Sequence, residues 1–156
     1  MLRLTKTGML FLCSIATLLS CQERQVVKAD YQVIPMPREI VADNQSAFKL
    51  TSATTIHSPA DNAQMEKVAN FLAGYIETST GNKLKVSSTE SAQAISLVID
   101  ESISNKEGYE LTVSADGVRI AGSTPAGVFY GVQTLRKSIP ATGGKKDVEL
   151  AAVKIS

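Results

Sequence analysis

The sequence predicts an α+β domain with two layers, in which two helices pack on a mainly antiparallel or mixed sheet. Two segments, residues 58–81 and 124–139, repeat apolar residues at helical spacing. Between them, residues 109–121 alternate apolar and polar side chains around an Asp-Gly pair, which is typical of a β-hairpin. Helical and strand patterns that share one short chain indicate an α+β fold rather than an all-helical or all-strand one.

The N-terminal residues 1–20 resemble a bacterial lipoprotein signal peptide. Arg3 and Lys6 precede an apolar run over residues 8–19, which is shorter than the roughly 20 residues that a membrane-spanning helix needs. Cys21 follows Leu-Leu-Ser directly, as does the lipidated first residue of a mature lipoprotein. The pattern predicts an exported protein that lipid on Cys21 anchors in the bacterial envelope, facing the periplasm, the outer membrane or the cell surface. An uncleaved anchor, or an ordinary signal with an incidental cysteine, is the alternative.

The composition of the remaining chain gives no indication of a nucleic-acid partner. Removing Arg3 and Lys6 from the 16 basic residues leaves 14 against 15 acidic residues, a net charge of −1. A nucleic-acid-binding domain would need a clustered basic face instead. Cys13 lies within the signal and Cys21 is the predicted lipid site, so no disulfide is expected in the mature domain.

The domain is predicted to follow a short tether. Residues 21–30 are polar and are assigned to the tether, and residues 31–156 are assigned to the domain. The domain opens with an extended segment over residues 31–37, where two prolines restrict the backbone. Short strands are predicted over residues 48–50 and 54–57.

The first helix is predicted to begin near Ser58 and to end at Gly81. Ser58 suits the N-cap, Pro59 the first helical position and Asp61 the capping-box position. Gly81 is a helix stop signal. Between these ends, apolar residues form one helical stripe: Met65, Val68, Ala69, Leu72, Tyr75 and Ile76.

The second half of the domain is predicted to add most of the strands. Residues 95–100 are a short apolar run, typical of a buried strand. The hairpin over residues 109–121 follows, and then the second helix. The glycine-rich residues 143–146 are predicted to form a loop, and residues 148–155 a last strand.

The second helix opens at Thr124-Pro125 and carries two glycines one turn apart. Gly127, Gly131 and Thr134 form a stripe of small residues beside the apolar stripe of Val128, Val132, Leu135 and Ile139. A glycine inside a helix costs about 0.5–1 kcal/mol relative to alanine, so two of them need a reason. Either the helix crosses its own sheet closely, or the small residues accept a second packing partner.

The segment EGYELTVSADGVRIAGSTPAGVFYGVQTLRKSIP resembles the N-terminal accessory domain of glycoside hydrolase family 20, the β-N-acetylhexosaminidases. Family members share the Gly-Tyr strand, the hairpin and the helix motif "AGSTPAG.FYG.QTL". The segment VIPMPREI over residues 33–40 is similar to the opening of the same domain. The resemblance covers residues 33–156, and it implies the zincin-like two-layer fold of hexosaminidase accessory domains.

The resemblance also implies that the chemistry lies outside this chain. In the family, a catalytic (β/α)8 barrel follows in the same chain and carries the active site. Its reaction removes terminal N-acetylhexosamine from glycans by substrate-assisted catalysis, with an adjacent Asp-Glu pair on the barrel and no metal or organic cofactor. The chain is therefore expected to be non-catalytic and inactive alone, to reach glycan only through a barrel, and to dock that barrel on Gly127, Gly131 and Thr134. The alternative is a stand-alone lipoprotein module that binds a glycan or a protein.

Other residue patterns are given ordinary structural interpretations. Asp100-Glu101 is an adjacent acidic pair at a strand end, but it precedes the hairpin and so falls in the accessory domain. His57 is the only histidine, and a metal site needs several converging ligands. Arg136-Lys137 and Lys145-Lys146 are interpreted as a solvated face. No residue of this chain is assigned a catalytic or metal-binding role.

Overall fold

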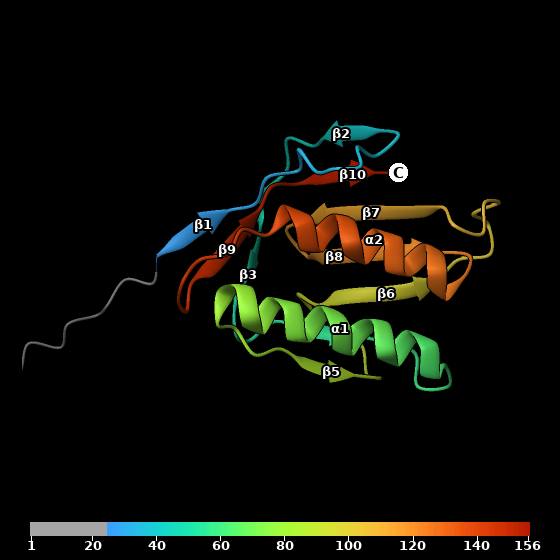
Figure 1. Cartoon of the computed structure of the whole chain (residues 1–156), viewed down its shortest axis with the longest axis horizontal. Helices are drawn as coiled ribbons and strands as arrows, with labels where there is room; N and C mark the ends of the chain where they lie inside the picture. The colour runs from blue at the N-terminus through green and yellow to red at the C-terminus, as the bar shows by residue number, and fades with distance from the viewer. Residues whose placement is uncertain (1–24) are drawn as a thin grey trace, which may run out of the picture.

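Two helices cover one face of a seven-stranded sheet in the computed structural model, which describes residues 25–156 (Figure 1). This arrangement confirms the predicted α+β class. The strands of the large sheet lie in the order β2 (Ile40–Ala42), β10 (Val153–Ile155), β7 (Tyr109–Ser114), β8 (Gly117–Gly122), β6 (Ile95–Ile99), β4 (Thr55–His57) and β5 (Lys85–Ser87). A second, three-stranded sheet consists of β1 (Val26–Lys28), β9 (Asp147–Leu150) and β3 (Phe48–Leu50).

The large sheet is mixed, as predicted. The pairs β2–β10, β10–β7 and β7–β8 are antiparallel, whereas the pairs β8–β6, β6–β4 and β4–β5 are parallel. The predicted hairpin is β7–β8, and Ser114 pairs with Gly117, so the two turn residues are Ala115 and Asp116. Gly117 is thus the first strand residue. A Cβ atom there would lie 2.7 Å from the Ala94 carbonyl oxygen, which explains why glycine occupies this position.

Helix α1 (Ala63–Thr80) begins later than predicted. Asn62, not Ser58, is the N-cap, and its side chain accepts hydrogen bonds from the backbone N–H groups of Gln64 and Met65. Ser58 continues the extended backbone of β4, because its N–H donates to the Ser87 carbonyl on the adjacent strand. The predicted end is confirmed: Gly81 is the C-cap, with a left-handed φ of 69° that glycine adopts without strain.

The predicted last strand is two strands in two different sheets. β9 pairs with β1 and β3, and β10 pairs with β2 and β7. The chain changes sheets at Ala151 and Ala152, between the two strands. The continuous apolar pattern of residues 148–155 contains no glycine or proline at this break, so the sequence gives no sign of it.

Part of the predicted tether belongs to the fold. Val26–Lys28 form β1, which pairs in parallel with β9, so the ordered domain begins before Tyr31. Predictions for residues 1–20 and Cys21 fall outside the described residues. Neither helix within residues 25–156 has both the length and the apolar character needed to cross a membrane.

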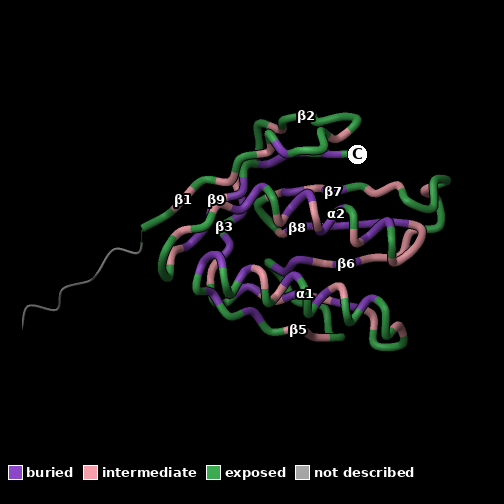
Figure 2. The backbone as a smooth tube through the Cα atoms, in the orientation of Figure 1, coloured by how far each residue is buried: buried purple, intermediate pink, exposed green. Residues whose placement is uncertain are grey.

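The core lies between the helices and the large sheet (Figure 2). Its fully buried side chains come from both helices and from both sheets, among them Phe48, Leu72, Ile95, Leu111, Ile120 and Leu135. The opposite face of the large sheet carries polar residues such as Thr112 on β7, Arg119 on β8 and Lys154 on β10. Within residues 25–156, the helices therefore cover one face of the sheet and leave the other uncovered.

Candidate docking face

Both glycines of helix α2 (Pro125–Ser138) face this chain's own sheet. A Cβ atom on Gly127 would lie 2.3 Å from the carbonyl oxygen of Gly108, at the start of the hairpin. A Cβ atom on Gly131 would lie 2.5 Å from Cγ2 of Ile120. Neither distance is possible without movement of the helix or the sheet, so the glycines allow α2 to cross the hairpin closely.

Thr134 completes this internal contact. Its hydroxyl lies 2.7 Å from the hydroxyl of Tyr109 on β7, and Thr134 is buried. The prediction that Gly127, Gly131 and Thr134 form a barrel-docking face is therefore wrong, because all three pack within the domain. The close crossing, which the sequence left open as the other explanation, accounts for the small residues.

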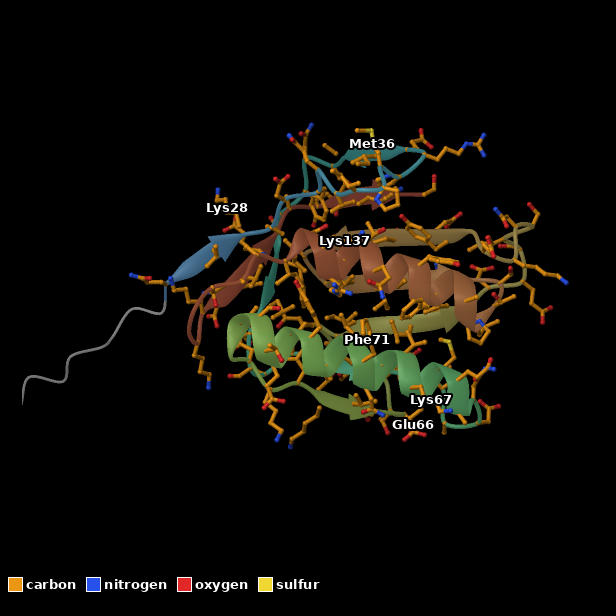
Figure 3. All side chains as sticks on the ribbon, viewed as in Figure 1. Lys28, Met36, Glu66, Lys67, Phe71 and Lys137 are labelled. Carbon is orange, nitrogen blue, oxygen red and sulfur yellow. The ribbon has the colours of Figure 1, made fainter. Side chains whose placement is uncertain are left out.

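The outward surface of the helix pair carries aromatic side chains instead. Phe71 of α1 is 40% exposed and Tyr130 of α2 is 43% exposed. Phe129 links them, because its ring centroid is 5.5 Å from that of Phe71 and 6.3 Å from that of Tyr130. Figure 3 shows Phe71 on α1, next to α2. The aromatic row thus bridges the two helices on the side away from the sheet.

A groove of about 850 Å³ continues from this row on the far side of α2. Tyr130 lines it, together with Met36, Tyr109 and residues of the loop before β7. Met36 is 81% exposed and lies beside β2 at the edge of the sheet (Figure 3). The Lys137 ammonium donates to the Ile34 carbonyl and so ties this segment to α2.

We call Phe71, Phe129, Tyr130 and Met36 the outer face. Large apolar side chains exposed together on one surface are typical of a protein-docking site. The small residues of α2 suggested a different surface, so this one was not predicted from the sequence. The signal was present: Tyr130 lies on the helix side opposite Val132 and Leu135, whose burial the apolar stripe already predicted, and Phe129 flanks that stripe.

Asp100 lies just after β6 in a network of hydrogen bonds. The Ser102 hydroxyl donates to Asp100 Oδ1 at 2.5 Å, and Arg119 Nη2 donates to Asp100 Oδ2 at 2.8 Å. The Ser102 hydrogen bond, followed by the Arg119 contact, lowers the pKa of Asp100 to about 2. An acid catalyst needs a pKa close to the working pH, and Glu101 beside it is exposed. The arrangement suits a structural role for Asp100 at the end of a strand, which is the interpretation given from sequence.

Within the described part of the chain, His57 and the acidic residues form no cluster of the kind that binds a metal. His57 is half-buried at the end of β4, and its Nδ1 atom has no hydrogen-bond partner within residues 25–156. The same part of the chain contains no group of three His, Cys, Asp or Glu residues suited to hold a metal ion.

Comparison with known proteins finds relatives among the hexosaminidases. Residues 30–156 match the family model for glycosyl hydrolase family 20, domain 2. The chain is 31% identical over 139 residues to a beta-hexosaminidase of Porphyromonas gingivalis, covering 83% of this chain and 18% of that protein. It is 29% identical over 122 residues to a beta-hexosaminidase of Vibrio vulnificus, covering 78% of this chain and 13% of that protein.

A solved structure shows the same fold. The family 20 β-N-acetylhexosaminidase from Streptomyces coelicolor superimposes with a TM-score of 0.66 and 28% sequence identity. The match covers 80% of this chain and 26% of the Streptomyces chain. This chain thus spans less than a fifth of the length of the curated relatives, and it corresponds to a single domain of them.

Proposed function

Since the chain belongs to glycoside hydrolase family 20, we propose that it acts as the non-catalytic accessory part of a β-N-acetylhexosaminidase-like glycosidase. The observation that carries the proposal is the match of residues 30–156 to domain 2 of the family, alongside relatives that are several times longer. This match favours an accessory domain over a stand-alone module that binds a glycan or a protein.

The proposed partner is a catalytic barrel, and the proposed contact is the outer face. The Gly127 side of α2 packs on the sheet and is unavailable to a second domain. The outer face exposes Phe71 and Tyr130 on the side of the helix pair away from the sheet, and Met36 beside β2 at the edge of the sheet. Burial of these side chains against a barrel would remove apolar surface from water. This would stabilise the contact by about 25 cal/mol per Å² of apolar surface buried.

The proposed reaction of the assembled enzyme is removal of terminal N-acetylhexosamine from glycans. The acetamido group of the substrate and the Asp-Glu pair of the barrel would supply the chemistry. This chain would contribute no reacting group, because Asp100 is held by Ser102 and Arg119. Its contribution is to support the barrel and keep its fold stable.

The proposed location is the bacterial envelope, with lipid on Cys21 as the membrane anchor. The Leu-Leu-Ser-Cys sequence supports this proposal. Replacement of Cys21 by alanine should release the protein into the soluble fraction of a bacterial host. A Cys21→Ala protein that stays as firmly membrane-bound as the parent would show that the apolar run itself holds it.

A chimeric enzyme tests the docking proposal. Residues 30–156 replace the matching segment of the Porphyromonas gingivalis beta-hexosaminidase, and hydrolysis of an aryl N-acetylhexosaminide is measured during heating. The chimera should be active. Phe71→Asp together with Tyr130→Asp should lower its inactivation temperature by several degrees, because charged side chains would be buried at the contact.

Thr112→Asp is the matched control, because it adds a carboxylate to the opposite face of the sheet, between Arg119 and Lys154. It should leave the inactivation temperature close to that of the parent chimera. Equal effects at both faces, or no effect of the Phe71 and Tyr130 changes, would rule out docking at the outer face.

A further inference from the structure

The described chain enters the fold at the end of the molecule where helix α1 finishes. Val26 on β1 pairs with Asp147 on β9, so this entry point lies directly beside the loop over residues 143–146. Figure 1 shows β1, β9 and the C-terminal end of α1 at the same end of the molecule. The surface groups of this loop therefore lie next to the point from which the chain leads back to Cys21.

Lysine side chains gather at this end of the molecule. The Lys146 N–H group donates to the Thr80 carbonyl oxygen at 3.0 Å, and the Asn82 side-chain amide donates to the Lys146 carbonyl oxygen at 2.5 Å. A Cβ atom on Gly81 would lie 3.0 Å from Cα of Lys145. These contacts hold the loop against the residues that follow α1, two of which are lysines. We call the resulting cluster the basic end: Lys83, Lys85, Lys145 and Lys146.

The positive charge of the basic end is not neutralised by ion pairs. Three of its lysines are exposed, and Lys146 is half-buried. Among residues 25–156, the ion pairs involve Lys28, Lys49 and Arg119, and none involves the basic end. The two carboxylates of β9 already lie close to Lys49 and Lys28. Glu77 is the acidic residue in the last turn of α1, and counting it against the four lysines still leaves a net charge of +3.

Cys21 lies close to the basic end along the chain. Val26 follows Cys21 by five residues. A chain extends at most about 3.6 Å per residue, so the two are separated by roughly 18 Å at most. Glu23 and Arg24, which lie between them, add no net charge. A lipid on Cys21 would therefore keep the basic end near the headgroups of the same membrane.

We infer, on the basis of the proposed envelope location, that the basic end binds the anionic phospholipid headgroups of the membrane in which lipid on Cys21 anchors the chain. Lysines close to an anionic lipid surface are attracted to it, and several of them act together with an acyl anchor. Lysine suits this contact, because its ammonium group stays hydrated on a flexible stem and needs no fixed acceptor geometry. The contact adds an orientation of the domain to the proposed anchor.

Binding at the basic end leaves the outer face accessible. Phe71 and Tyr130 lie in the middle part of α1 and α2, whereas the basic end lies beyond the last residue of α1. The domain thus stands on one end of its helix pair, with the side of the helices open to a second domain. The interpretation of Lys145-Lys146 as a solvated face, given from sequence, describes the same surface without the membrane.

The test uses the acylated protein, purified from a bacterial host and inserted into vesicles of two compositions. One is phosphatidylcholine, and the other is an equimolar mixture of phosphatidylcholine and anionic phosphatidylglycerol. Hydrogen exchange, measured by mass spectrometry, follows the backbone amides of residues 143–146. At low salt, exchange should be about fivefold or more slower in the anionic vesicles, because the attraction of one lysine alone shifts the equilibrium by about that factor. High salt should remove the difference.

Two triple variants of equal charge separate the basic end from the overall charge. The first removes three exposed lysines of the basic end: Lys83→Gln, Lys85→Gln and Lys145→Gln. The control removes three exposed lysines elsewhere on the domain: Lys67→Gln, Lys106→Gln and Lys154→Gln. Lys67 lies near the start of α1, at the opposite end of that helix (Figure 3), and the Lys106 carbonyl contacts the N-cap of α2. The first variant should lose most of the difference between the vesicles, and the control should keep it.

Equal exchange in the two kinds of vesicle, with acylated protein in both, would mean that the lysines face solvent or a partner other than lipid. The inference would then be wrong, while the proposed location would stand. Equal loss of protection in the two triple variants would also overturn it, because the overall charge would then decide the contact. A mature protein whose mass shows no lipid on Cys21 would instead contradict the proposed location, and the inference would fail with it.

Discussion

At the scale of single residues, the glycines of α2 show how one composition permits two opposite interpretations. Gly127 and Gly131 require a close neighbour, and the spacing alone does not say whether the neighbour is the sheet below or a domain above. The position of Gly108 and Ile120 decides the question in favour of the sheet. The sequence pattern therefore marks the residues that make a close contact but does not say which neighbour they contact.

The first prediction concerns Gly127. Gly127→Ala should lower the free energy of unfolding of this chain by about 1–3 kcal/mol, because the new methyl group would collide with a backbone carbonyl. Gly74→Ala is the control: Gly74 lies within α1 with no atom near its Cβ position, so the change should stabilise the chain by about 0.5–1 kcal/mol. Urea denaturation measures both. An unchanged stability for Gly127→Ala would mean that α2 does not rest on the hairpin.

The second prediction concerns Asp100 and pH. Its pKa is about 2 in the folded chain and about 3.9 in the unfolded chain. The ionised carboxylate therefore contributes stability above about pH 4, and this contribution is lost as the pH falls toward about 2. Between these values, the free energy of unfolding should decrease more steeply for the parent than for Asp100→Asn. Denaturation curves at a series of pH values test this, with Glu101→Gln as a control that should follow the parent. If the free energy of unfolding depended on pH in the same way for the parent and Asp100→Asn, the hydrogen bonds of Asp100 would not stabilise the folded chain.

At the scale of elements, strong periodicity was informative; of the three-residue strands, the sequence predicts β3 and β4 but not β1, β2 and β5. The two helices, the β7–β8 hairpin and β6 follow from apolar spacing and turn residues. Strands β1, β2 and β5 have three residues each, too few to show alternation. The division of the last strand into β9 and β10 depends on pairing with β3 and β7, which lie far away in the sequence. Such pairing is a property of the folded chain that local patterns do not carry.

The third prediction concerns the start of α1. Asn62→Ala should lower the free energy of unfolding by about 1 kcal/mol, because two backbone N–H groups of the first turn would lose their acceptor. Ser58→Ala should change it much less, since the buried Ser58 hydroxyl has no hydrogen-bond partner among residues 25–156. Thermal unfolding of both variants shows which substitution destabilises the chain more. A larger loss of stability for Ser58→Ala than for Asn62→Ala would mean that Ser58 is the N-cap, as predicted from sequence.

At the scale of the whole molecule, the two sides of the domain differ in the side chains that they expose. The uncovered side of the large sheet is polar, whereas the helices expose Phe71 and Tyr130 on the other side. The motif of α2 was sufficient to predict the family. It was not sufficient to predict the outer face, because that surface combines residues of α1, α2 and the segment before β2.

The central proposal is that this chain is an accessory domain of a glycosidase and contains no catalytic centre of its own. Hydrolysis of an aryl N-acetylglucosaminide by the chain expressed alone tests the claim directly, beside the Asp100→Asn, Glu101→Gln double variant. Enzymes accelerate their reactions about 10⁶-fold or more, so even weak catalysis would be visible against buffer. The account predicts no turnover by either protein. Turnover by the parent that disappears in the double variant would contradict it and make Asp100 and Glu101 a catalytic pair.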